Sequence, residues 1–283
     1  MIARIKMCVV VGMALALAAC GKNSPFSADS LGNLVGGGAG HAIRAGGHLA
    51  NAEAMSEKDE DTLGQSVGVA LTNRYGLVQD EKVLQYVTLV GLTVATASPN
   101  PNGNYVFGVL NTNDVNAFSG PNGYVFVTRG LLSRLKDEAE LAGVLAHEVA
   151  HVCSHDGLHQ VQAAERRAAA SEALAAAHSE AERFSRVLDM GVDVLTKQGY
   201  SQPQEFDADK AGVKIMAAAG YDPQSYLRFL QRLQQEEGSS GGGELMSSHP
   251  GVGSRVQRVS QQIATMKPGG ATLAERFASN VGR

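Results

Sequence analysis

The chain has 283 residues and a formal net charge of −4, with 44% apolar and 18% charged residues. This apolar content is enough for a hydrophobic core and excludes a chain that is disordered throughout. The slightly acidic balance argues against a nucleic-acid partner, because such proteins present a basic surface. Three cysteines are too few for a disulfide scaffold.

The first 19 residues resemble a secretory signal rather than part of a fold. Arg4 and Lys6 precede an uncharged, mostly apolar stretch at 7–19, which is too short to span a bilayer as a helix. Residues 17–20 (LAAC) resemble the lipid-attachment sequence of bacterial lipoproteins. The resemblance implies cleavage before Cys20, a lipid on its thiol, and anchoring in the outer membrane on the periplasmic side. The alternative is an ordinary cleaved signal followed by an incidental cysteine.

The composition predicts four segments along the chain. These are the signal at 1–19, the lipidated Cys20 with a flexible Gly-, Ser- and Asn-rich tether at 20–55, one domain at 56–267, and a weakly structured tail at 268–283. Cys153 is the remaining free cysteine, so no intrachain disulfide is expected, and we interpret it as a small core residue.

Hydrophobic periodicity within the domain predicts many helices and two strands. Helical spacing of apolar residues, together with capping signals, covers 56–75, 80–97, 136–156, 160–197, about 202–220, 223–237 and 250–266. Two apolar segments, 105–110 (YVFGVL) and 124–128 (YVFVT), are typical of strands, and residues 116–123 between them are turn-like. This pattern predicts an α+β fold that is mainly α.

Residues 147–151 (HEVAH) form an HExxH motif on the predicted helix 136–156. His147 and His151 are four residues apart, so they share one helix face and can bind one Zn²⁺. Glu148 lies beside them, where it can act on a water at the metal. The alternative is two surface histidines without a metal role.

A catalytic zinc site needs a third protein ligand. A metzincin pattern would require histidine at 157, where this chain has Gly157. His155 and His159 lie too far along a straight helix to reach the same ion. The remaining candidate is Glu205, with Asp209 one turn later to accept a hydrogen bond from a ligand histidine. An acidic helix N-terminus that complements the dipole is the alternative, and the HExxH motif favours the ligand interpretation.

Four segments, in this order, resemble a known family: 116–132, 140–151, 200–212, and His249-Pro250 with Arg255. They are similar to the membrane-associated gluzincin endopeptidases of the HtpX/BepA type, a family that includes the CAAX prenyl proteases. The resemblance covers about residues 60–266 and suggests a bacterial lipoprotein form. It implies a zincin-type metalloprotease domain, a small β-sheet packed on the HExxH helix, and one Zn²⁺ per chain.

The resemblance also implies roles for individual residues. His147, His151 and Glu205 would be the zinc ligands, and Glu148 the catalytic base that assists attack by zinc-activated water. His249 would approach the metal, either to stabilise an oxyanion or to block the site, and a plain turn before a helix is the alternative.

Four further residues and one strand complete the expected site. Arg255 would either hold the segment around His249 or bind a carboxylate. The strand 124–128, with the preceding loop 116–119, would pair with extended substrate, so that substrate runs along Asn116, Phe118 and Tyr124. A plain core hairpin is the alternative there.

The sequence therefore predicts a zinc-dependent metalloendopeptidase. By resemblance, it would act on misfolded or unassembled cell-envelope proteins in the periplasm, attached to a membrane through lipid on Cys20. Two alternatives remain: a non-proteolytic chaperone or assembly factor on the same fold, and a latent protease whose zinc is capped by His249.

Overall fold

The computed structural model describes residues 57–170, 180–237 and 248–282. They all fall within one unit of the chain, Gly40–Arg283. The predicted signal, Cys20 and tether lie outside the described residues. The main elements are, in chain order, α3 (Glu57–Tyr75), α4 (Glu81–Thr96), β1 (Val106–Leu110), β2 (Ala117–Ser119), β3 (Tyr124–Thr128), α5 (Arg129–Leu132), α6 (Glu138–Cys153), α7 (Asp156–Ala170), α8 (Glu180–Asp193), α9 (Gln202–Ala218), α10 (Pro223–Glu237), α12 (Val252–Ala264) and α13 (Ala274–Val281).

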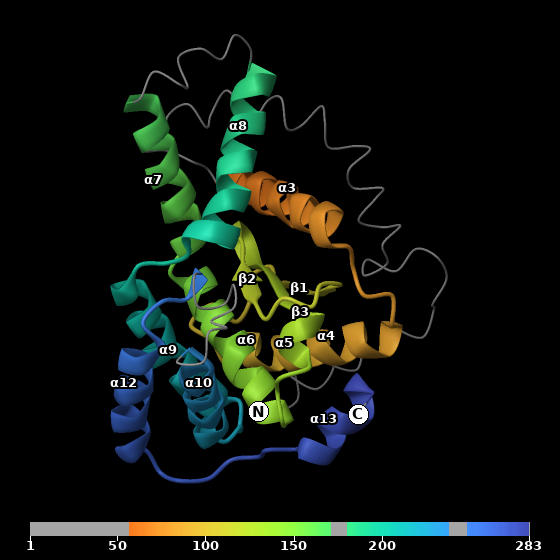
Figure 1. Ribbon diagram of the computed structural model, residues 1–283, viewed down its shortest axis with the longest axis vertical. Coiled ribbons are helices and arrows are strands. Elements are labelled where there is room, and N and C mark those ends of the chain that lie inside the picture. The colour runs from red at the N-terminus through yellow and green to blue at the C-terminus, as the bar shows by residue number, and fades with distance from the viewer. Residues whose placement is uncertain (1–56, 171–179, 238–247, 283) are drawn as a thin grey trace, which may run out of the picture. The chain divides into compact units, whose positions relative to one another are not determined.

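Three short strands form one sheet in the order β1-β3-β2 (Figure 1). β3 is parallel to β1 and antiparallel to β2, so Phe126 lies opposite Gly108 on one side and Phe118 on the other. Side chains of β3 alternate between two cores: Val125 and Val127 pack with residues of α4 and α6, whereas Phe126 packs with residues of α3. Both faces are buried, which explains why this strand is apolar at every position but its last.

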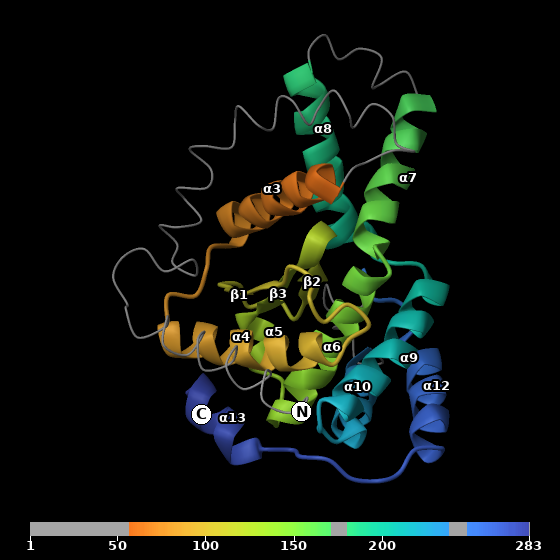
Figure 2. The same cartoon turned by 180° about the vertical axis from the view of Figure 1, so that it is seen from behind.

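The sheet lies between α3 on one face and α4 with α6 on the other, as the two opposite views show (Figures 1 and 2). α9, α10 and α12 pack together beside α6. Every residue of α6 from Glu138 to His151 is therefore buried. The predicted fold class, mainly helical α+β with a small sheet on the HExxH helix, is confirmed. None of the described helices is both long and apolar enough to cross a bilayer.

Several predicted boundaries differ from the structure. Residues 117–119, expected to be turn, form the edge strand β2. The helix expected to reach residue 156 ends at Cys153, because His155 has a left-handed backbone (φ 52°) that an α-helix does not continue through. The helix expected over 160–197 corresponds to α7 and α8, and residues 171–179 lie outside the described part.

The tail after residue 267 is not weakly structured, because it contains α13. Phe277 of this helix is 1% exposed, and its ring centre lies 6.3 Å from that of Tyr86 on α4. Arg276 is ion-paired with the buried Glu138, which also accepts hydrogen bonds from the hydroxyls of Tyr86 (2.8 Å) and Tyr221 (2.7 Å). So short a helix is marginal by itself and depends on this anchoring, which periodicity does not reveal.

Candidate metal centre

The HExxH residues lie on α6, the helix that the rest of the fold surrounds. Asp137 caps its start by accepting a hydrogen bond from the backbone N–H of Glu140 at 2.8 Å. Further along, His147, Glu148 and His151 are each no more than 3% exposed. The four-residue spacing brings the Nε2 atoms of His147 and His151 within 3.1 Å of each other. The two imidazoles therefore converge on one point.

The helix α9 contributes a third residue to this point. Glu205 lies in its first turn, after Pro203. The two carboxylate oxygens of Glu205 lie 3.4 Å from Nε2 of His147 and 3.4 Å from Nε2 of His151. α9 approaches α6 this closely because Gly212 has no side chain: a Cβ there would lie 3.1 Å from the backbone of His147.

His249 joins the cluster from the segment before α12. Its Nδ1 lies 3.0 Å from Oε1 of Glu205, and its Nε2 lies 3.6 Å from Oε1 of Glu148. The ligand atoms of His147, His151, Glu205 and His249 all lie within 4.8 Å of one another, and all four residues are buried. The fold therefore gathers three histidines and one glutamate from three separate segments.

The spacing of these atoms fits a tetrahedral metal ion. With metal–nitrogen bonds of about 2.0–2.1 Å, ligand atoms in such a site are about 3.3 Å apart. The pairs formed by His147, His151 and Glu205 are separated by 3.1, 3.4 and 3.4 Å. Two imidazoles and a carboxylate are also a donor set of catalytic zinc sites. The residues present thus fit the cofactor that the sequence predicts.

Asp209 holds the first imidazole. Its Oδ1 lies 3.0 Å from Nδ1 of His147, which leaves Nε2 of that ring free for a metal. The same carboxylate accepts hydrogen bonds from the hydroxyl of Tyr226 (2.8 Å) and from Nε and Nη2 of Arg255 (both 2.8 Å). Asp209 therefore lies where the sequence analysis expects it, against one of the two HExxH histidines.

Asp156 holds the second imidazole, and the sequence analysis does not identify it. Its Oδ2 lies 2.7 Å from Nδ1 of His151, and its Oδ1 accepts a hydrogen bond from the Gln204 amide at 2.9 Å. In a straight α-helix, a residue five positions after His151 would be rotated about 140° from it around the helix axis, so its side chain would point away from His151. The left-handed backbone of His155 redirects the chain. The one available signal is Gly157, which is typical of a break.

Arg255 is a buried cation (4% exposed) between two carboxylates of α9. In addition to its bonds with Asp209, its Nη1 lies 2.6 Å from Oε2 of Glu205. Burial by itself would raise the pKa of both carboxyls. His249 and Arg255 instead lower the pKa of Glu205 well below its usual range, and Arg255 with His147 lowers that of Asp209. Both residues therefore stay ionised. The Nη1 atom of Arg255 also donates a hydrogen bond to the His249 carbonyl at 3.4 Å, so its contacts are compatible with both expected roles.

Glu148 faces the cluster from α6, between β2 and His249. Its Oε2 accepts a hydrogen bond from Oγ of Ser119 at 2.7 Å. Tyr200 donates a hydrogen bond to the Ser119 carbonyl at 2.9 Å, and its ring stacks on His151 with ring centres 3.9 Å apart. Sequence patterns do not identify Ser119, because its contact with Glu148 depends on how the edge strand lies against α6.

Substrate is expected to pair with the strand 124–128 and the preceding loop 116–119, and the structure leaves no free edge for such pairing on the strand 124–128 itself. This strand is β3, the middle strand, and β1 and β2 occupy both of its edges. The edge strand beside the metal cluster is β2, where the carbonyl oxygen of Ala117 lies 3.5 Å from Nε2 of His249. Strand addition near the cluster is therefore open to β2 alone among the three strands of the described sheet.

The three residues expected along the substrate have other surroundings. Phe118 and Tyr124 pack in the core that includes α3. Asn116 is buried, and its Oδ1 accepts hydrogen bonds from its neighbour Ala117 (backbone N–H, 2.9 Å) and from Oγ of Ser248 (3.0 Å). Asn116 thus helps to hold the segment that carries His249.

Metal binding to this cluster should release a proton. Burial and Arg255 lower the pKa of His147. Glu205 and Asp209 raise this pKa by more than that, so it lies at about 9 in the metal-free protein. The ring is therefore protonated at neutral pH, and a metal ion must displace that proton. Since the pKa is raised, the proton stabilises the metal-free fold fully below about pH 6.5, and this contribution is lost as pH rises through about 9.

Asp156 and Glu205 also raise the pKa of His151 against the effect of burial. We therefore expect zinc affinity to increase at least tenfold per pH unit between roughly pH 7 and pH 9, and to level off above. Calorimetric titrations in two buffers with different ionisation enthalpies count the protons released. A zinc affinity independent of pH over this range would contradict the argument.

The convergent side chains of His147, His151 and Glu205, with Glu148 beside them on the HExxH helix, define a zincin-type metallopeptidase domain. Residues 81–263, more than half of the chain, match Peptidase family M48. The chain belongs to this family. The predicted family and the predicted class, a metalloendopeptidase, are thereby confirmed at the level of family membership.

Proteins with sequences similar to this chain are also named as proteases. The chain is 26% identical over 281 residues to the beta-barrel assembly-enhancing protease of Escherichia coli (strain K12), covering 95% of this chain and 55% of that protein. It is 30% identical over 171 residues to metalloprotease YcaL of the same strain (59% and 66%), and 30% identical over 149 residues to the mitochondrial metalloendopeptidase OMA1 of Schizosaccharomyces pombe (52% and 43%). The chain thus spans about half the length of the first of these.

Proposed function

We propose that this protein is a zinc-dependent endopeptidase. The observation that carries the proposal is the buried carboxylate of Glu148 beside a cluster of His147, His151 and Glu205 at tetrahedral spacing. A pure binding module has no need of a metal-ligand set with a base next to it. A zinc ion held there would acidify water and polarise the carbonyl of a bound peptide.

The protein's own residues supply proton transfer and orientation. Glu148 accepts a proton from the attacking water and delivers it to the leaving amine. Ser119 fixes the orientation of that carboxylate through its hydrogen bond of 2.7 Å. Asp209 and Asp156 keep the rings of the two histidines in the orientation that directs Nε2 at the metal position.

The substrates that we propose are misfolded or unassembled proteins of the cell envelope. One relative is named a beta-barrel assembly-enhancing protease, which supports a role with envelope proteins. Residues 17–20 support attachment to a membrane through lipid on Cys20, with the domain in the periplasm and the outer membrane favoured. Mass spectrometry of the N-terminal peptide from membranes tests the anchor: we expect a diacylglycerol on Cys20, and a free thiol there would exclude it.

Metal analysis combined with a protease assay tests the activity. Protein from residue 21 onward should contain about one zinc per chain and degrade an unfolded substrate such as casein. A chelator should remove both the metal and the activity, and added zinc should restore both. Zinc-replete protein that binds casein without cleaving it would instead favour the non-proteolytic chaperone or assembly factor.

We further propose that the resting enzyme is latent, because His249 blocks the open position of the metal site. Its imidazole is 4% exposed and lies against both Glu205 and Glu148. A catalytic zinc site keeps one position open for water or substrate. A side chain in this place competes for that position, so the resting enzyme would be capped until the segment moves.

Replacement of His249 by Ala separates capping from oxyanion stabilisation. A cap that weakens substrate access by about 1.4 kcal/mol predicts a tenfold rise in peptide cleavage. An oxyanion donor predicts a fall of about 10²–10³-fold. We expect the rise, measured as kcat/KM on a short peptide. His159→Ala, which removes an exposed imidazole on α7 outside the cluster, serves as the control. Unchanged cleavage in His249→Ala would count against both roles.

A further inference from the structure

Tyr200 contacts three parts of the site that come from separate segments of the chain. It lies two residues before α9 begins and is 6% exposed. Its ring packs on His151 of α6, and its hydroxyl donates a hydrogen bond to β2. Its backbone N–H donates a hydrogen bond at 3.1 Å to the carbonyl of Ser248, the residue before His249. One buried residue therefore joins a proposed metal ligand, the edge strand beside the proposed base, and the segment that carries His249.

The ring of Tyr200 restricts the tilt of the His151 imidazole. The two ring centres lie 3.9 Å apart, and the ring planes are inclined by 21°. Nδ1 of the imidazole lies 2.7 Å from the carboxylate of Asp156. That contact fixes one atom but leaves the ring free to tilt about it, and the stacked face of Tyr200 blocks this tilt. Together, the two contacts direct Nε2 of His151 at the metal position.

The hydroxyl of Tyr200 holds a carbonyl that faces away from the sheet. At the end of β2, the backbone N–H of Gly120 donates a hydrogen bond to the carbonyl of Tyr124 at 2.8 Å. Because bonded residues alternate along an antiparallel ladder, the backbone of Ser119 faces away from β3. Its carbonyl accepts the hydrogen bond from Tyr200 at 2.9 Å instead.

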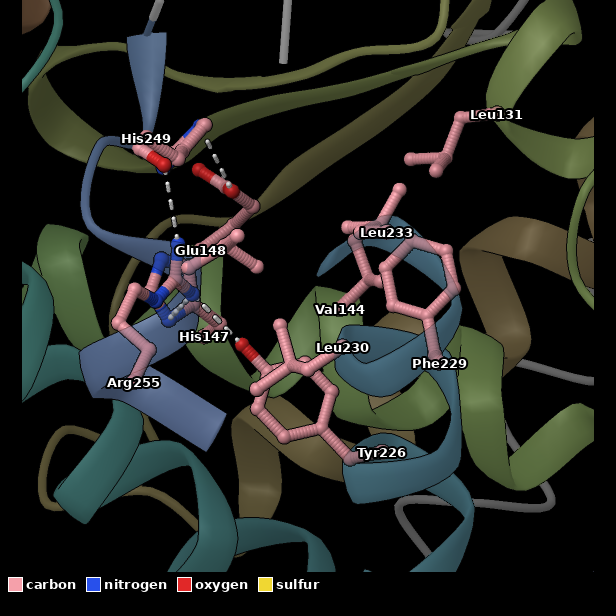
Figure 3. A pocket seen from close by; sticks show the side chains of 11 residues that line it. Leu131, Val144, His147, Glu148, Tyr226, Phe229, Leu230, Leu233, His249 and Arg255 are labelled. Carbon is pink, nitrogen blue, oxygen red and sulfur yellow. Dashed lines mark hydrogen bonds and ion pairs between the residues drawn. The ribbon is translucent and has the colours of Figure 1, made fainter. Parts of the chain in front are cut away.

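Ser119 connects this contact to Glu148. Tyr200 holds the backbone of Ser119, whose Oγ donates a hydrogen bond of 2.7 Å to Oε2 of Glu148. The other oxygen of Glu148 lies 3.6 Å from Nε2 of His249, and the two side chains lie close together in Figure 3. A shift of β2 would therefore turn the carboxylate that must face the attacking water. Since the hydrogen of the Tyr200 hydroxyl is directed at the Ser119 carbonyl, Tyr200 acts on the base rather than on a substrate.

We propose that Tyr200 is a positioning residue with two separable functions. Its hydroxyl orients the base Glu148 through Ser119, and its ring orients the metal ligand His151. The inference rests on the proposed endopeptidase activity and adds a residue that the HExxH motif does not include.

Tyr200→Phe removes the hydroxyl and keeps the ring. We expect kcat on a short peptide to fall about 10–100-fold, because a displacement of about 1 Å can cost that much in rate. KM and zinc affinity should not change, because the ring still stacks on His151. An unchanged kcat, or a loss of zinc that accounts for the lower rate, would overturn the function of the hydroxyl.

Tyr221→Phe is the matched control for a purely structural effect. Tyr221 is 5% exposed, and its hydroxyl also donates one hydrogen bond, at 2.7 Å, to a buried acceptor, Glu138. Both variants lose one buried hydrogen bond, so their losses of stability in urea unfolding should be comparable. A kcat that falls equally in the two variants would reflect lost stability and would overturn the proposal.

A double-mutant cycle with Ser119→Ala tests how the hydroxyl acts. Ser119→Ala removes the bond to Glu148 but keeps the carbonyl that Tyr200 binds. If the hydroxyl acts through Ser119, kcat should fall by a similar factor in each single variant and little further in the double variant. Factors that multiply in the double variant would mean that the hydroxyl acts independently of Ser119 and would overturn this part.

Tyr200→Leu tests the ring. Loss of the stacked face should weaken zinc binding about tenfold relative to Tyr200→Phe, the lower end of what partners of metal ligands contribute. Competition with a chromophoric chelator measures this affinity without turnover. If Tyr200→Leu does not fold, Tyr200→Met, with a more adaptable side chain, decides in the same way. Equal zinc affinities of Tyr200→Phe and the aliphatic variant would overturn the function of the ring.

The measurements separate this proposal from the activity on which it rests. Casein that survives zinc-replete wild-type protein overturns the endopeptidase, and the zinc affinities of Tyr200→Phe and Tyr200→Leu then still decide whether the ring positions His151. Casein cleavage with kcat and zinc affinity unchanged in both variants retains the endopeptidase and overturns the two positioning functions.

Discussion

Glu148→Gln should abolish most proteolysis while the protein keeps its zinc. The amide has nearly the shape of the carboxylate and can still accept the hydrogen bond from Ser119, so the local structure should persist. It cannot take up a proton at neutral pH, so the base is lost. We expect kcat to fall by about 10²–10⁴-fold, the usual contribution of general acid–base catalysis, with zinc content measured on the same sample.

Two other variants on α9 complete this experiment. Glu205→Ala removes a ligand, so it should lose both zinc and activity. Asp207→Asn changes an exposed carboxylate two residues away and should affect neither. Undiminished casein cleavage by zinc-loaded Glu148→Gln would refute the assignment of Glu148 as the base.

The parts of the site that depend on a single helix could be predicted from the sequence. His147 and His151 share a face of α6 because of their spacing, and that face remains as predicted when the helix is buried. Glu205 and Asp209 are likewise one turn apart on α9, and both reach the histidines of α6. The pairing of α9 with α6 itself was expected from the resemblance, since periodicity does not specify which helices meet.

Residues whose position depends on irregular backbone were not predictable in this way. Asp156 reaches His151 only because His155 adopts a positive φ, which non-glycine residues seldom adopt. Ser119 reaches Glu148 from β2, a strand of three residues that lies next to a Pro-Asn-Gly turn and reads as part of it. The order of the strands in the sheet could not be predicted from the sequence either. Because β3 is the middle strand, it has no free edge with which a substrate strand could pair.

The buried cation beside the proposed metal ligands could not be predicted from the composition. Arginine is rarely buried, so nothing in the sequence places Arg255 inside the core. In the structure it is 4% exposed and joins α12 to Glu205 and Asp209 of α9. The fold and the metal centre therefore depend on the same ion pairs, and loss of this cation should weaken both.

Arg255→Met should destabilise the metal-free protein strongly. The substitution removes the guanidinium that contacts both Asp209 and Glu205, and breaking a buried pair in this way costs about 3–5 kcal/mol. For a domain of this size, that loss corresponds to a fall in Tm of about 6–20 °C. Arg258→Met on the same helix is the matched control: Arg258 is exposed, its guanidinium carbon lies 4.0 Å from the ring centre of the half-buried Phe206, and its loss should cost at most about 1 kcal/mol.

The pH dependence identifies the cause of that loss. Because Arg255 lowers the pKa of Asp209, the stabilisation is present above the usual Asp pKa of about 3.9 and is lost as pH falls through the lowered pKa of the folded state. The stability difference between wild type and Arg255→Met, from thermal or urea unfolding, should therefore be largest near neutral pH and narrow below about pH 4.

Adding Asp209→Asn to Arg255→Met should recover part of the stability, because it removes one of the two carboxylates that lost the guanidinium. A constant difference across pH, with no recovery in the double variant, would mean that Arg255 stabilises the core through packing rather than charge.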